Sequence, residues 1–241
     1  MSTAAGSVPT TRTIPTTPTG PRRHDPRTVL VGFVCMAERP DWYTVSERLN
    51  DLAGYSTVGL APVYRAHRWT RRERLINPTR QGRYCYAAGG RVGSLRLDRI
   101  RAQAGRNADY EWWTWAQVTA GTPRARTKDE ITQANPRADE KTITKLFEQQ
   151  PRVAAMLEYN ARTDIPVRLA PENLDVFQAG CGKYWRFQVM SSVVGDEMCS
   201  LMGDFWFPQS DSLADRFAYL TKANHHLDCM GPGSWLVCAR L

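Results

Sequence analysis

The first half of the chain alternates between strand-like and helix-like spacing of its apolar positions. The apolar run at residues 29–36, rich in β-branched side chains, predicts a buried strand. Apolar residues at helical spacing over residues 41–54 predict a helix that Asp41 caps at its start. Strand-like segments follow at residues 56–64 and 82–88, so the chain opens as strand, helix, strand, strand.

A second helix and a fourth strand complete this first unit. Ser94 can cap a helix that Gly105 ends, because glycine is a common helix terminator. The Trp-rich segment at residues 110–118 predicts the fourth strand, buried beneath the rest of the chain or placed in a subunit contact. The order βαββαβ predicts an α+β protein with a ferredoxin-like antiparallel sheet over residues 29–120.

The second half of the chain, residues 121–241, is expected to extend or cover that sheet. A polar linker at residues 121–136 precedes two amphipathic segments over residues 138–160, which predict a helical hairpin. Glycine turns divide residues 174–207 into a predicted β-meander. The remaining elements expected here are a helix at residues 211–224 and a closing strand at residues 234–241.

The N-terminal tail, residues 1–28, is rich in Thr and Pro and contains no Trp, Tyr or Phe. Its composition predicts a disordered or extended arm, since it offers little apolar surface to bury. A basic cluster of Arg22, Arg23 and Arg27 lies where the arm meets the first unit. The alternative is that these arginines bind RNA or a neighbouring subunit.

Charge is distributed unevenly between the two halves. Residues 1–120 hold 18 basic and 9 acidic residues, a net charge of +9, whereas residues 121–241 hold 14 and 15, a net charge of −1. Arginine accounts for 27 of the 32 basic residues, and its guanidinium suits bidentate phosphate contacts and stacking on bases. The asymmetry favours an acidic partner, with nucleic acid the first candidate.

The arginines concentrate between the second and third predicted strands, at residues 64–83, where Glu73 is the single acidic residue. Such a run is either a solvated surface, screened by salt over about 8 Å, or a phosphate-binding loop. Aromatic residues are interleaved, so we predict a nucleic-acid site formed by Arg65, Arg68, Trp69, Arg71, Arg72, Arg74, Arg80 and Arg83.

Three aromatic residues on the predicted central strands could stack bases. Tyr84 and Tyr86 are two positions apart and therefore share a face, and Phe33 lies on the first strand. RNA-recognition motifs use this arrangement, although residues 83–87 lack the glycine and the full aromatic spacing of that signature.

Two weaker motifs keep other chemistry open. The segment from Gly89 to Ser94 lies between a predicted strand and a predicted helix, as a phosphate-binding turn would, but Ala88 replaces the first glycine of a dinucleotide fingerprint. The Cys and His residues of the C-terminal part match no standard zinc spacing. They also do not specify a Cys–His nucleophilic pair. These residues are Cys181, Cys199, His225, His226, Cys229 and Cys238. We predict no metal and no cofactor.

These patterns favour a non-catalytic, nucleic-acid-binding structural protein that self-assembles, such as a capsid protein or nucleoprotein. Single-stranded RNA and further copies of the chain are the expected partners. One alternative is a small α+β enzyme that binds a phosphate-bearing substrate at Gly89–Ser94. The other is a protein–protein adaptor that uses its Trp-rich surface.

The sequence also carries expectations about the compartment. No apolar run approaches the ~20 residues that span a membrane, and the N-terminus lacks the apolar core of a signal peptide. We therefore expect a cytoplasmic or virion location, no membrane partner, and six reduced cysteines.

Overall fold

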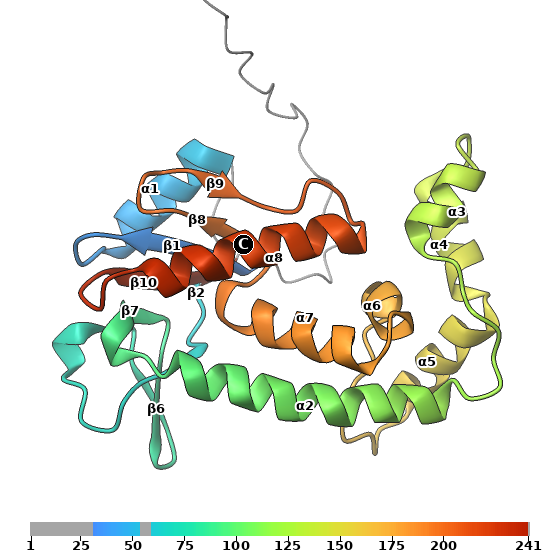
Figure 1. The fold of residues 1–241 in the computed structure, drawn as a ribbon, viewed down its shortest axis with the longest axis horizontal. Helices are drawn as coiled ribbons and strands as arrows, with labels where there is room; N and C mark the ends of the chain where they lie inside the picture. The colour runs from blue at the N-terminus through green and yellow to red at the C-terminus, as the bar shows by residue number, and fades with distance from the viewer. Residues whose placement is uncertain (1–30, 54–58, 241) are drawn as a thin grey trace, which may run out of the picture.

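The fold is that of a computed structural model, which describes residues 31–53 and 59–240. The predicted arm with Arg22, Arg23 and Arg27 lies outside the described residues, as do parts of the first two predicted strands. An α+β architecture is confirmed, with two sheets and a larger helical part (Figure 1).

The main sheet gathers strands from both ends of the chain. Within the described ranges its order is β4 (Leu75–Ile76), β7 (Gly89–Arg91), β10 (Trp235–Arg240), β1 (Val31–Met36), β8 (Glu197–Cys199) and β9 (Phe205–Trp206). A further short strand, β2 (Gly59–Leu60), pairs with the end of β10. Strand β1 is antiparallel to β10 and parallel to β8.

The outer sheet is smaller and is formed by β3 (Tyr64–Arg65), β6 (Tyr84–Ala87) and β5 (Thr79–Gln81), in that order. Its β5–β6 hairpin projects away from the body of the molecule, at the lower left of Figure 1. The predicted strand at residues 82–88 is thus confirmed in part, because the chain leaves β6 at Ala88 and enters the main sheet as β7.

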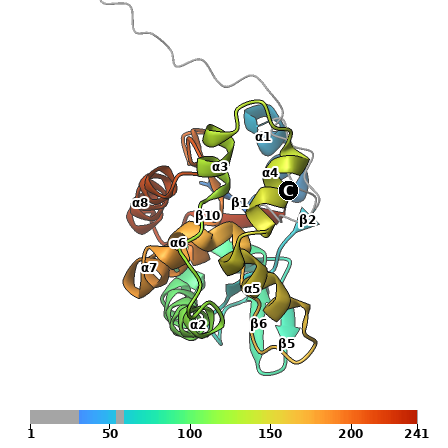
Figure 2. The ribbon, with the colours of Figure 1, turned by 90° about the vertical axis from the view of Figure 1, so that its right-hand side faces the viewer.

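Helices cover both faces of the main sheet. Helix α1 (Trp42–Ala53) begins as predicted, with the Thr44 amide donating to Asp41 Oδ1 over 2.7 Å, and packs Val45 and Leu49 on one face. On the other face lie α7 (Cys181–Val194) and α8 (Leu213–Cys229), whose Val194 and Leu227 join the larger core cluster. The end-on view in Figure 2 shows α7 between α2 and α8.

Helix α2 (Leu97–Val118) corrects two predictions. It runs through Gly105 without ending, and it contains the residues 110–118 that were expected to form a strand. A Cβ at Gly105 would lie 2.7 Å from Trp185 Nε1, so this glycine allows α2 and α7 to pack closely. Trp115 is buried, whereas Trp113, two positions earlier, is exposed. Residues two apart would share a face in a strand, so this difference fits a helix.

The remaining helices lie at the far end from the outer sheet (Figure 1). Helices α4 (Glu140–Glu148) and α5 (Pro151–Ala161) confirm the predicted hairpin. The predicted linker is wrong in part, because α3 (Lys128–Ala134) forms within it behind a capping box of Thr127 and Glu130. The predicted meander is mostly helical, as α6 (Leu174–Gln178) and α7, and only β8 and β9 form its strands.

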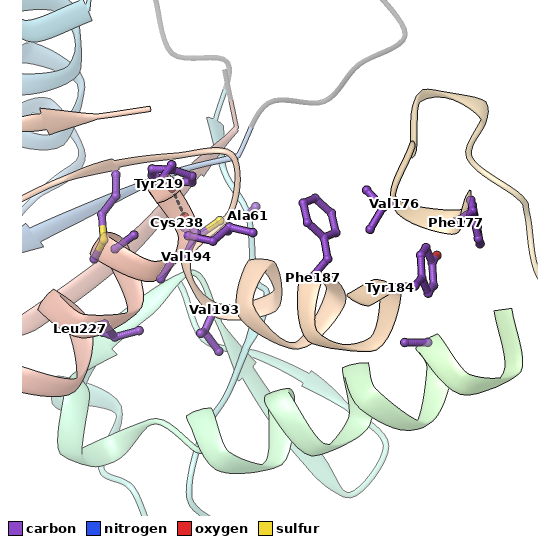
Figure 3. Packing of buried hydrophobic residues seen from close by; sticks show 14 of the residues in the cluster. Ala61, Val176, Phe177, Tyr184, Phe187, Val193, Val194, Tyr219, Leu227 and Cys238 are labelled. Atoms are coloured by element: carbon purple, nitrogen blue, oxygen red, sulfur yellow. Dashed lines mark hydrogen bonds between the residues drawn. The ribbon is translucent and has the colours of Figure 1, made fainter. Parts of the chain in front are cut away.

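Aromatic stacking fills the helical part of the core. Phe177 of α6 lies between Trp115 and Tyr184, with ring centroids 5.2 Å and 4.1 Å apart. Figure 3 shows Tyr184 beside Phe177, while Phe187 and Val193 project from other sides of α7 into the same core cluster. The Tyr184 hydroxyl is 2.7 Å from Glu111 Oε2, and both this bond and burial raise the pKa of the tyrosine.

The ferredoxin-like order is not seen. Its fourth strand is helical, and β10, from the far end of the chain, occupies the place beside β1. None of the helices in the described ranges is both long and apolar enough to cross a membrane.

Candidate nucleic-acid interface

The Arg-rich segment is anchored to the core by a few buried side chains. Tyr64, Leu75 and Ala87 are almost fully buried, and the Tyr64 hydroxyl lies 3.5 Å from the Val193 carbonyl oxygen at the end of α7. These anchors belong to the same cluster as the helices behind the main sheet. The arginines between them are therefore presented on a fixed scaffold.

Strand register separates an inner and an outer face of the outer sheet. Arg65 is opposite Tyr86, and Tyr84 is opposite Gln81. Directly paired residues point to the same side, and alternate residues point to opposite sides. Because Ala87 is buried, the Tyr84 and Tyr86 side chains face outward together with Arg65.

Tyr84 lies among guanidinium groups on this outer face. Arg65 Cζ is 3.7 Å from the centroid of its ring and Arg83 Cζ is 5.1 Å away, both within cation–π range. A hydrogen bond from Arg83, together with the positive charges of Arg83 and Arg65, lowers the pKa of the Tyr84 phenol below its usual value. The arrangement is a preformed patch of positive charge and flat π surface.

The tip of the hairpin presents two more arginines. Gly82 has a φ of 60°, which a two-residue hairpin turn favours at its first position, and Arg83 follows it. Arg80 Nε donates to the Gly82 carbonyl oxygen over 3.2 Å. Both arginine side chains are exposed, on a hairpin that projects from the body of the molecule (Figure 1).

The segment between β3 and β4 carries the remaining predicted residues. Trp69 is 84% exposed, and Arg68 Cζ lies 5.1 Å from its ring centroid. Arg71 Nη1 lies 3.7 Å from Glu73 Oε1, and both side chains are largely exposed. This ion pair therefore adds little stability. Arg72 and Arg74 are also exposed, on a single 3-10 turn.

The structure therefore brings together part of the predicted set. Arg65, Tyr84 and Tyr86 belong to strands β3 and β6 of the outer sheet and Arg83 to its hairpin turn, whereas Phe33 belongs to β1 of the main sheet. The single sheet that was expected to carry Phe33 beside the two tyrosines does not form, because β1 pairs with β10 and β8 and the tyrosines lie in the outer sheet.

Several basic residues were missed. Arg91, Arg99 and Arg106 follow the predicted loop and are exposed, so that residues 65–106 contain twelve arginines and two acidic residues. A count of charge continued past residue 83 would have found them.

The glycine-rich segment has a structural role. Gly89 and Gly90 are part of β7, and a Cβ on Gly89 would overlap the Leu236 carbonyl oxygen and lie 2.9 Å from Val237 Cα in β10. A Cβ on Gly93 would lie 2.9 Å from Pro232 Cβ. These glycines allow close approach of β10 and the turn before it, which explains them without a bound phosphate.

The Cys and His residues are dispersed. His225 Nε2 lies 3.9 Å from Cys229 Sγ on α8, while Cys199 and Cys238 are buried in the main sheet. Within residues 31–53 and 59–240, no three His, Cys, Asp or Glu side chains are grouped to hold a metal ion.

Comparison with protein-family models, curated proteins and solved structures finds no match to this chain.

Proposed function

We propose that this chain is a structural protein that binds single-stranded nucleic acid, with RNA favoured, and self-assembles as capsid proteins and nucleoproteins do. Binding would use the outward face of the outer sheet and the exposed segment before β4. Phosphates would contact the arginines, and bases would stack on Trp69, Tyr86 and the guanidinium planes over Tyr84.

The observation that carries the proposal is the group formed by Tyr84, Arg65 and Arg83. The Arg65 guanidinium covers the tyrosine ring at 3.7 Å, so ring and cation are already in contact in the chain without a partner. Preorganised groups lose less conformational entropy on binding. Base–aromatic stacking and phosphate contacts are also tolerant of sequence, as a protein that packages a strand requires.

Self-assembly is supported by exposed apolar side chains on another side of the molecule. Tyr43 of α1 and Met202 in the β8–β9 turn are 73% and 90% exposed. Arg48 Nη2 lies 3.5 Å from the Leu201 carbonyl oxygen, which connects this turn to α1. In Figure 1, α1 lies above the main sheet and the β5–β6 hairpin below it, so subunit contacts and strand binding would not compete.

The first experiment is titration of a labelled single-stranded RNA at increasing salt. We expect affinity to fall with salt, with a slope of about −0.7 per phosphate contact in a plot of log K against log salt concentration. The triple variant Arg68→Ala, Arg71→Ala, Arg72→Ala should reduce that slope by about 2 and weaken binding to all sequences alike.

The matched control removes the same charge at the opposite end of the molecule: Arg124→Ala, Arg126→Ala, Arg137→Ala. These side chains are also exposed. Equal losses in both triple variants would mean that only net charge matters, and salt-independent binding would rule out phosphate contacts. A single-stranded DNA of the same length tests the preference for RNA.

Size-exclusion chromatography before and after nuclease tests the assembly. We expect nucleic acid, detected by the ratio of absorbance at two wavelengths, to co-elute with an oligomer. A nuclease-insensitive oligomer that carries no nucleic acid would support the adaptor alternative instead.

A further inference from the structure

One exposed stripe of α2 combines the same residue types as the outer sheet. It contains Arg99, Gln103, Arg106, Tyr110 and Trp113, all exposed. The tyrosine and tryptophan side chains are 53% and 61% exposed, far more than aromatic side chains that serve a core. At about 100° per residue, these positions fall within a narrow sector of the helix surface.

The stripe continues from the candidate interface. The Arg96 amide, directly before α2, donates to the Arg65 carbonyl oxygen of β3 over 2.8 Å. Ala66, the next residue, forms a bridge to Leu95. Helix α2 therefore begins at the edge of the outer sheet, and its 22 residues extend about 33 Å from there.

Side chains of the stripe are held in place. Trp113 packs edge-on against Trp112 at 5.4 Å between ring centroids, and Trp112 Nε1 donates to the Phe177 carbonyl oxygen over 3.1 Å. Arg106 Nη2 donates to Gln103 Oε1 over 2.6 Å. The exposed indole thus rests on a ring that is anchored in the core.

We propose that the exposed stripe of α2 is a second contact for the same single strand, which would pass from the outer sheet along the helix. The inference rests on the proposed function. Arg99 and Arg106 would contact phosphates, and Tyr110 and Trp113 would stack bases. Charge complementarity selects this occupant, because twelve arginines against four acidic residues over residues 65–113, the span of the two surfaces, suit a polyanion.

The test compares two oligonucleotide lengths on the full chain. Labelled oligouridylates of about 5 and about 20 nucleotides lie near the lower limit and above the upper limit of the usual ~4–16 nucleotide site sizes. For Tyr110→Ala, Trp113→Ala we expect about tenfold or greater weakening on the long strand and little change on the short one, since base stacking is lost only beyond the outer sheet.

Two further variants separate stacking from charge and from misfolding. Tyr110→Phe, Trp113→Phe should bind the long strand like the wild type, because a phenyl ring still stacks. Arg99→Ala, Arg106→Ala should reduce the salt slope on the long strand by about 1.4, at ~0.7 per phosphate. Arg137 is exposed at the other end of the molecule. The variant Arg137→Ala is therefore a control that shows how far the salt slope changes when one arginine outside the proposed contacts is removed.

The outcomes distinguish the two proposals. If the wild type binds neither strand, both fail. If Arg68→Ala, Arg71→Ala, Arg72→Ala weakens binding at both lengths while the α2 variants match the wild type at both, the α2 inference fails and the proposed function stands. If the α2 variants change sedimentation of the protein alone but not strand affinity, the stripe is a protein contact and the inference also fails.

Discussion

Strand β10 of the main sheet buries five consecutive residues, Trp235 to Ala239, whereas all three residues of β5 in the outer sheet are exposed. The main sheet is covered by α1 on one face and by α7 and α8 on the other, and its central strands consist almost entirely of apolar residues. The outer sheet has one covered face, so its other face can carry arginine and tyrosine at no cost in buried charge.

The titratable groups of the two sheets differ in the same way. Burial raises the pKa of the Cys35 thiol, and it raises that of Cys238 to about 12. Neighbouring arginines instead lower the pKa of Tyr84 in the outer sheet. Close packing on both faces restricts the main sheet to apolar side chains. The uncovered face of the outer sheet can instead carry charged and aromatic side chains. Each of the following measurements tests one side of this contrast.

The largest expected effect is Gly89→Ala, at the junction of β7 and β10. The added methyl group overlaps the Leu236 carbonyl oxygen, and backbone atoms of a central strand cannot move aside easily. We expect a loss of about 3 kcal/mol or more in the free energy of unfolding, measured by urea denaturation.

Gly59→Ala is the matched control for that substitution. Gly59 also pairs with β10, but a Cβ there would have no neighbour within 4 Å. We expect a change of about 0.5 kcal/mol or less. Equal effects at the two glycines would contradict the view that close strand packing fixes Gly89.

A smaller effect should appear at alkaline pH. A thiol whose folded pKa is raised stabilises the fold fully below its unfolded pKa, and this contribution is lost as pH rises above that value. The pKa of Cys238 is about 12 in the folded chain against an ordinary 9.0. At pH 10 this difference should lower the free energy of unfolding by about 1.4 kcal/mol relative to neutral pH. Urea denaturation between neutral and alkaline pH measures this loss.

The Cys238→Val variant isolates the contribution of this residue. Valine fills a similar volume and does not ionise, so the decline in stability with pH should become shallower by the share of one thiol. An unchanged pH profile would show that Cys238 ionises as easily in the folded chain as in the unfolded one.

The smallest expected effect concerns Tyr84 and leaves neutral-pH stability unchanged. A phenol with a lowered folded pKa adds stability only at alkaline pH, and the addition is lost as pH falls through the folded value. Arg83→Ala removes the main cause, so we expect the Tyr84 pKa to rise towards its ordinary value of 10.0.

Titration of ¹³C-labelled tyrosine, assigned with Tyr84→Phe, measures that pKa. If Arg83→Ala leaves it unchanged, the arginine does not contact the ring in solution. The group that carries the proposed function would then lack one of its members.

The sequence predicted local features of both parts of the molecule, although it did not predict that the outer sheet is separate from the main one. Strand alternation is a local rule that places Tyr84 and Tyr86 on one face, and the arginines are clustered within residues 65–83. Helix α1 and its Asp41 cap were equally visible. These local features can be predicted without knowing which distant segments of the chain are in contact.

Predictions failed where tertiary contacts overrode local preference. The segment Glu111–Ala116 and much of α7 are rich in residues that favour strands, yet they are helical because their buried faces pack on each other and on Phe177. The sequence predicts a helix end at Gly105 because the close approach of Trp185, which requires this glycine, is a tertiary contact. Phe33 was misplaced because the pairing of β1 with β10 joins residues some 200 positions apart.

That pairing has a consequence for how the chain folds. Val31 lies opposite Arg240, and β10 separates β1 from β7, so the centre of the main sheet depends on contacts between segments that are synthesised at very different times. Pairings this distant are slow to form, because the entropy of closing a long loop is lost before the contacts are gained. A ribosome-bound chain that ends before Trp235 would leave β1 and β7 without the strand between them, so the scaffold of the outer sheet could be completed only late in synthesis.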